Sequence, residues 1–147
     1  MILDYRPALR AFLLADAGIA ALVATQRVFE LKLPQGIRAT SLVYQGFATP
    51  VDPHMQGPSS IAVERVQIDA YAQSQDVATD LANRVRERLD GFRGAWPMTW
   101  LEGSPVPSLT VQGVFFEGGV PIFWDSDVDL ARKGNDYMIH FVERVPA

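Results

Sequence analysis

Cysteine is absent from this 147-residue sequence, and histidine occurs only twice. The lack of thiols excludes disulfide bonds, thiolate zinc sites and cysteine catalysis. The longest uninterrupted apolar run, residues 17–24, is shorter than the roughly 20 residues that a membrane-spanning helix needs, so no membrane partner is expected. The 13 basic against 17 acidic residues give a net charge of −4, which argues against a general nucleic-acid binder.

Helical patterns occur in two parts of the chain. Apolar residues recur at helical spacing over residues 4–15, and the phase breaks near Asp16. We predict one helix over residues 4–15 and, after the break, a second, short helix with Asp16 as its N-cap. The two helices form an N-terminal helical arm. A longer amphipathic helix follows Ser74, another good N-cap, and ends at Asp90-Gly91, where glycine supplies the left-handed cap.

The remaining regular segments have strand patterns, with alternating or β-branched and aromatic residues. They cover residues 27–31, 41–47, 61–72, 109–117, 120–124 and 137–145. Gly118-Gly119 predicts a tight hairpin between the fourth and fifth of them. Strands arriving as hairpins around one amphipathic helix predict an α+β fold. We expect a single domain over residues 1–147, with a small, mostly antiparallel β-sheet and the long helix packed on it.

Three connections stand out as long or irregular: residues 49–60, 93–108 and 125–136. Prolines interrupt the first two, and surface loops of this kind commonly carry contacts with partners. The candidate partner-contact residues in these two loops are Asp52, His54, Met55, Trp96 and Trp100. The two tryptophans have two interpretations: exposed anchors of the kind that dominate interfaces, or side chains that cover an edge of the core.

Signatures of catalysis and metal binding are missing. No segment matches a phosphate-binding glycine loop, a nucleophile elbow or a paired-histidine metal helix. Residues 125–129 imitate the start of a calcium-binding loop, but Leu130 stands where that loop needs glycine. The arginines of the long helix share its surface with acidic residues, which is typical of a solvated face. We therefore predict no catalytic residue, no metal site and no cofactor.

Several short segments, in this order and spacing, resemble the tail completion proteins of long-tailed phages. These proteins are also called tail terminators or head-to-tail joining proteins, with relatives in prophages and gene transfer agents. The segments are Ala8-Leu9-Arg10-Ala11 with the Asp16-Ala17 break, Leu33-Pro34-Gln35-Gly36, Leu42-Val43-Tyr44-Gln45, Val66-Gln67-Ile68-Asp69-Ala70-Tyr71, Leu89-Asp90-Gly91-Phe92-Arg93-Gly94 and Val111-Gln112-Gly113-Val114-Phe115.

The resemblance implies a structural protein of a virion, made in the bacterial cytoplasm, that caps the tail tube as a homo-hexameric ring. Such a ring stops tube polymerisation and receives the head-side connector or stopper protein. The resemblance leaves open whether the free subunit is a monomer until assembly. We expect the loop at residues 49–60 to be mobile until it meets a partner. DNA passes through the ring without specific binding, and Asp69 and Glu117 are candidates for a weakly repulsive, acidic lumen.

Two other functions remain as alternatives. One is another ring component of the head-to-tail junction, an adaptor or a stopper, which would contact the portal side. The other is a small enzyme or ligand-binding domain, which would need a pocket with titratable groups of displaced pKa.

Overall fold

A computed structural model describes residues 3–48, 53–54, 57–58, 61–98 and 108–143. Its helices are α1 (Tyr5–Leu14), α2 (Ala17–Leu22), the 3-10 helix η1 (Ala24–Gln26) and α3 (Gln75–Leu89). Its strands are β1 (Val28–Glu30), β2 (Ser41–Ala48), β3 (Pro53–His54), β4 (Gly57–Pro58), β5 (Ile61–Ala72), β6 (Gly94–Pro97), β7 (Ser108–Gly119), β8 (Phe123–Asp125) and β9 (Leu130–Val142).

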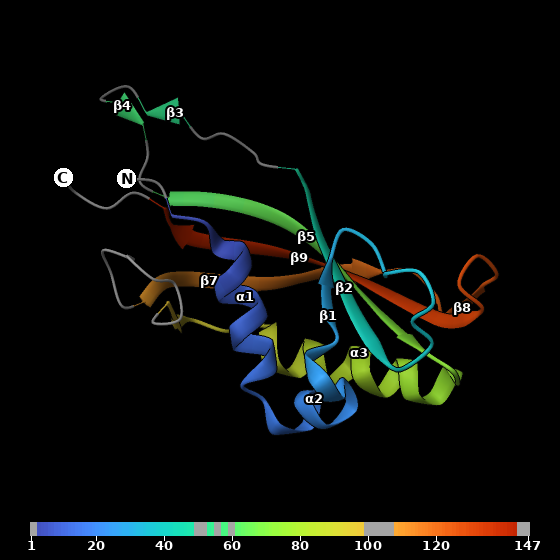
Figure 1. Cartoon of the computed structure of the whole chain (residues 1–147). Coiled ribbons are helices and arrows are strands. Elements are labelled where there is room, and N and C mark those ends of the chain that lie inside the picture. The colour runs from blue at the N-terminus through green and yellow to red at the C-terminus, as the bar shows by residue number, and fades with distance from the viewer. Residues whose placement is uncertain (1–2, 49–52, 55–56, 59–60, 99–107, 144–147) are drawn as a thin grey trace.

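One sheet organises the fold, in the order β1-β2-β5-β9-β7-β6, and β8 pairs with β9 beside the part that β7 leaves free. The pairing of β1 with β2 is parallel, and the other pairings in this sheet are antiparallel. The helices α1, α2 and α3 lie on one face of the sheet (Figure 1). The predicted α+β class, mostly antiparallel sheet and N-terminal helical arm are confirmed.

Local capping chemistry sets the helix ends as predicted. The backbone N–H of Ile19 donates to the Asp16 carboxylate at 3.1 Å, and this cap starts α2 after a break of two residues from the end of α1. The N–H of Val77 donates to Ser74 Oγ at 3.2 Å at the start of α3. Gly91 follows α3 with φ of +78°, a left-handed conformation that glycine adopts without a Cβ penalty.

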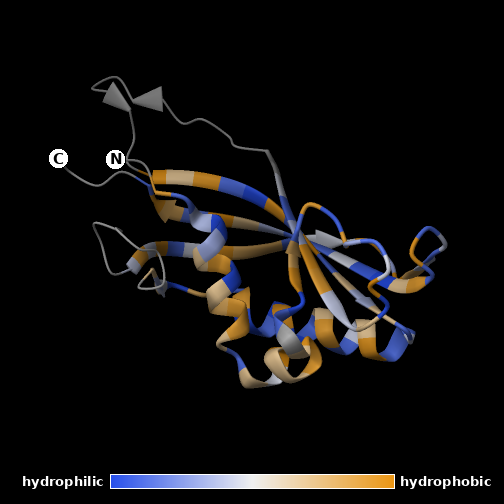
Figure 2. Ribbon diagram, in the orientation of Figure 1, coloured by the Kyte–Doolittle hydropathy of each residue, from blue (hydrophilic) through white to orange (hydrophobic). Residues whose placement is uncertain are grey.

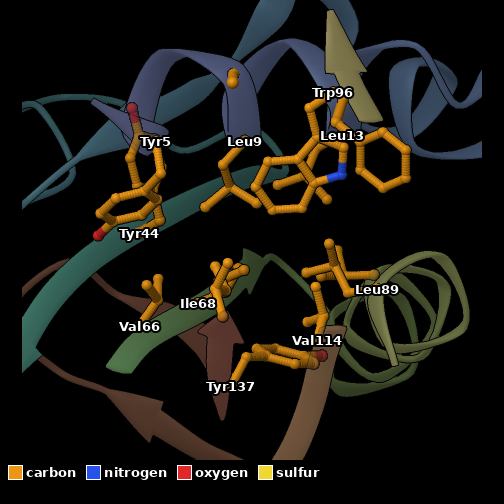
Figure 3. Packing of buried hydrophobic residues seen from close by; sticks show 14 of the residues in the cluster. Tyr5, Leu9, Leu13, Tyr44, Val66, Ile68, Leu89, Trp96, Val114 and Tyr137 are labelled. Carbon is orange, nitrogen blue, oxygen red and sulfur yellow. The ribbon is translucent and has the colours of Figure 1, made fainter. Parts of the chain in front are cut away.

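The main core lies between the helix layer and the sheet. Figure 3 shows Leu9 and Leu13 of α1 directed toward sheet residues that include Ile68 of β5, with Leu89 of α3 beside Val114 of β7. Leu9, Leu13 and Leu89 are fully buried. Removing each such side chain from water contributes about 2 kcal/mol to the stability of the fold. The amphipathic helix predicted after Ser74 thus turns its apolar face to the core, where Leu81, Val85 and Leu89 are buried.

Two predictions about the last third of the chain are wrong. β8 does not form a hairpin with β7, because both strands pair with β9, at different positions along it. The predicted connection at residues 125–136 is also mostly strand, since β9 begins at Leu130. Only residues 126–129 form a turn, which the Asp129 N–H closes by donating to the Asp125 carbonyl at 2.8 Å.

Candidate assembly surfaces

Trp96 is buried, which favours the second of its two interpretations, a side chain that covers an edge of the core, over an exposed anchor for a partner. It lies in β6, the last strand of the sheet, and none of its surface is exposed. Its ring stacks on Phe12 of α1 with centroids 5.3 Å apart, so the indole covers the core at that sheet edge. Of the other candidate contacts, Asp52, Met55 and Trp100 lie outside the described residues and His54 falls in β3.

Asp69 is not an exposed lumen acid, although strand alternation placed it on the side of β5 away from the helices. It is 4% exposed, because its carboxylate lies over Gly134, its register partner on β9. A Cβ at Gly134 would collide with that carboxylate, so the glycine leaves the space that Asp69 fills. Asp69 accepts a hydrogen bond from Gln67 Nε2 at 2.9 Å and pairs with Arg132 at 2.8 Å. Over its second half, β5 therefore buries the side chains on both of its sides.

Arg132 joins three strands on this face. Its guanidinium donates to Asp69 of β5 at 2.8 Å and to Asp125 of β8 at 3.2 Å. It also lies 5.3 Å from the ring centroid of Tyr71 and 5.7 Å from that of Phe123. Burial works to lower the pKa of Arg132, but the Asp69 charge and hydrogen bonds outweigh it and raise the pKa. The cation is thus held charged in a semi-buried site.

The other charged groups singled out from the sequence also have structural contacts. Arg88 donates to the Phe12 carbonyl at 2.9 Å, Arg86 lies 3.8 Å over the Phe116 ring, and Arg84 pairs with Asp80 at 3.1 Å. Across the described residues, no three side chains of metal-ligating type come together as a metal site. None of the helices within that part of the chain is both long and apolar enough to cross a bilayer.

The helix-free face of the sheet has two unlike halves. Near the end of β5, a small cluster of Leu33, Val43, Tyr71 and Leu130 is buried, because residues from the segment after β1 and from the turn before β9 pack there. At the start of β5 the apolar side chains remain half-buried or exposed. Figure 2 shows hydrophobic colouring over these first residues of β5, followed by a hydrophilic stretch.

We define the outer-face patch as the apolar and aromatic side chains on this second half. Its members are Ile61, Val63, Phe115, Met138, His140 and Val142. The register places Ile61 opposite Val142, and Met138 opposite Phe115, on three adjacent strands. Phe115 is 49% exposed and meets His140 edge-on with centroids 5.4 Å apart. Glu117, two residues further along β7, is exposed and lies at the bulge between Phe116 and Gly118.

Leu31 forms a second exposed apolar feature, directly after β1 ends at Glu30. Its side chain is 66% exposed and its φ is +73°. The Lys32 N–H donates to the Glu30 carbonyl at 2.9 Å, which makes a γ-turn with positive φ, the rarer and more strained kind. The Leu31 N–H donates to the Tyr44 carbonyl at 2.9 Å and fixes this turn to β2. A strained backbone thus holds a leucine out in solvent.

Comparison with known proteins gives a family for this arrangement. The sequence model of the family described as "Tail completion protein gp17" matches residues 7–106. The chain belongs to this tail completion family. Family membership gives it a structural role in a phage tail and a place in the virion, in assembly with other tail or head proteins. No curated protein matches the sequence.

A solved structure described as "Virion of native gene transfer agent (GTA) particle" contains a chain with the same fold. The two are 21% identical, 92% of each chain is covered, and the TM-score is 0.62. At this identity the likeness concerns the fold. The likeness covers 92% of the chain and so reaches beyond residue 106, where the match to the family model ends.

Sequence reasoning missed three residues that shape these surfaces. Phe115-Phe116 carried a usable signal, since neighbours in a strand point to opposite sides and one of the two must leave the core. Leu31 stands alone between polar residues, where a protruding apolar side chain is hard to distinguish from a buried one. Arg132 lay in a segment interpreted as a loop, so its partners on two other strands were not predictable.

Proposed function

We propose that this protein caps the finished tail tube as a hexameric ring, ends polymerisation of the tube protein and provides the surface on which the head-side connector or stopper docks. The proposal treats residues 1–147 as one tail-completion domain that acts without catalysis. The observation that carries it is the family match over residues 7–106. The exposed surfaces agree with it, because a cyclic ring needs two different patches on each subunit.

The proposed channel passes DNA without binding it. A subunit of net charge −4 suits this role, because a strongly basic lumen would hold the phosphate backbone. Since Asp69 is paired with Arg132, Glu117 is the remaining exposed acid of the two lumen candidates. The tube and connector contacts stay assigned to the irregular loops by composition, with Asp52, His54, Met55 and Trp100 as candidates.

The first test is the mass of the protein in solution, with and without purified tail tubes. Light scattering after size exclusion should give six times the 16.2 kDa subunit mass, or negative-stain images should show a ring at one end of each tube. A 16.2 kDa monomer that ignores the tubes at high concentration would contradict the proposal.

Deletion of the gene separates a terminator from the neighbouring ring components. Loss of a terminator should leave filled heads and detached tails of irregular, often excessive length, because nothing stops the tube. Loss of an adaptor or stopper should instead leave tails of normal length beside heads that leak DNA. The second result would move this protein to the portal side of the junction.

A further inference from the structure

We infer that Leu31 and Lys32 of one subunit pack against the outer-face patch of the next copy, with Phe115 and Glu117 as their partners. The inference rests on the proposed ring and names the surfaces that would hold it together. Both surfaces are exposed in the isolated subunit, where Leu31 is 66% and Phe115 49% exposed. Contiguous exposed apolar side chains, such as those of the outer-face patch, commonly mark interaction surfaces.

The positions of the two surfaces suit a head-to-tail contact. Leu31 follows β1, the first strand of the sheet order, whereas Phe115 lies in β7, four strands away. At a strand spacing of about 4.8 Å, they are separated by roughly 19 Å across the sheet. Two different patches on opposite sides of a subunit generate a heterologous contact, and repetition of that contact closes a ring when its rotation permits.

Charge complementarity favours a second copy of this chain as the occupant. Lys32 adjoins Leu31, and Glu117, which is exposed, lies two residues from Phe115 at a bulge in β7. Neither Lys32 nor Glu117 forms an ion pair with another described residue. Each surface therefore presents one large apolar side chain beside one unpaired charge, and the two charges are opposite. Electrostatic complementarity of this kind fixes register between partners.

The edge of β1 is covered, which favours a subunit contact through side chains over the addition of a strand from the neighbouring copy. An open edge strand invites another chain to add to the sheet through backbone hydrogen bonds. Here Arg10 Nε donates to the Val28 carbonyl at 3.1 Å, and Arg6 pairs with the Glu30 carboxylate at 2.6 Å. These arginines from α1 cover the edge, so the γ-turn at Leu31 becomes the exposed part of this side.

Cross-linking of cysteine variants tests the contact directly, because the natural chain has no cysteine. The variant Lys32→Cys/Glu117→Cys should give, with a short bis-maleimide, a ladder of covalent multimers up to the closed ring. The control Lys32→Cys/Asn83→Cys moves one thiol to the exposed side of α3, in the helix layer, and should stay monomeric. Equal ladders from both variants, or none from the first in particles that still form rings, would overturn the inference.

Charge reversal tests the pairing. Lys32→Glu or Glu117→Lys alone should raise the concentration at half-assembly by about tenfold, since each turns an attraction into a repulsion. The double variant Lys32→Glu/Glu117→Lys restores opposite charges and should return to within about threefold of the natural protein. Glu87→Lys, an equal charge change on α3, is the control and should leave assembly unchanged.

The outcomes separate this contact from the ring itself. If the natural protein forms no ring, alone or on tail tubes, the proposed function fails and this inference falls with it. If rings form and both single reversals assemble normally, the contact alone is wrong. A Glu117→Lys variant with intact rings and slower DNA ejection would place Glu117 in the lumen and overturn its assignment to the subunit contact.

Discussion

Replacing Asp69 by Asn should destabilise the fold by about 2 kcal/mol, because it leaves Arg132 in a semi-buried site with one partner fewer. Breaking a fully buried ion pair costs about 3–5 kcal/mol. The side chains of Arg132 and Asp69 are 29% and 6% exposed, and Arg132 keeps its bond to Asp125, so the expected loss lies below that range. The change keeps the shape of the side chain, and the amide oxygen still accepts from Gln67.

A double-mutant cycle isolates the pair from other effects of the substitution. Urea unfolding followed by tryptophan fluorescence is measured for Asp69→Asn, Arg132→Gln and the double variant. The matched cycle uses Asp80→Asn and Arg84→Gln on α3, where both side chains are about half exposed and the coupling should not exceed about 0.5 kcal/mol. A coupling between Asp69 and Arg132 no larger than that of the surface pair would refute the burial argument.

Three further predictions concern caps, aromatic burial and pH. Ser74→Ala should lower the free energy of unfolding by about 1 kcal/mol in urea titrations, through loss of the α3 cap. Trp96→Ala should cost about 3–5 kcal/mol, whereas Trp124→Ala, at a residue 46% exposed, should cost much less. Burial raises the pKa of Tyr71 and Tyr137 to about 12. The unfolded chain releases these protons near pH 10, so stability present below pH 10 should fall from pH 10 to 12, by about 1.4 kcal/mol per pH unit per tyrosine. Absorbance at 295 nm should show no tyrosinate from either residue while the native fold persists at pH 10.5.

Local sequence signals predicted the helices well because their causes are local. Asp16 and Ser74 cap the helices that follow them, and Gly91 ends α3, through contacts within a few residues. The strand at residues 61–72 has the predicted bounds. Its alternation also identified the helix-facing side, since Val66, Ile68, Ala70 and Ala72 are all buried.

The errors concern pairings between distant parts of the chain. Residues 130–136 are mostly polar or small, and they form a strand because β5 pairs on one side while β7 and β8 pair on the other. Sheet context outweighs intrinsic strand preference in such a position. Asp69 was expected to be exposed because its burial depends on Arg132 and Gly134, more than sixty residues away. Trp96 likewise lay in a segment whose contact with α1 no local pattern reveals.

The burial of Asp69 also changes which surface is available for assembly. Had Asp69 been exposed, the helix-free face would have carried an unpaired acid at its centre and would have suited a channel wall. With that charge neutralised by Arg132, much of the half near the end of β5 is buried, and the outer-face patch around Phe115 supplies exposed apolar surface on the other half. An exposed apolar surface favours a subunit contact over a passage for DNA. The proposed subunit contact and the proposed lumen therefore compete for Glu117, and charge reversal at Glu117 decides between them.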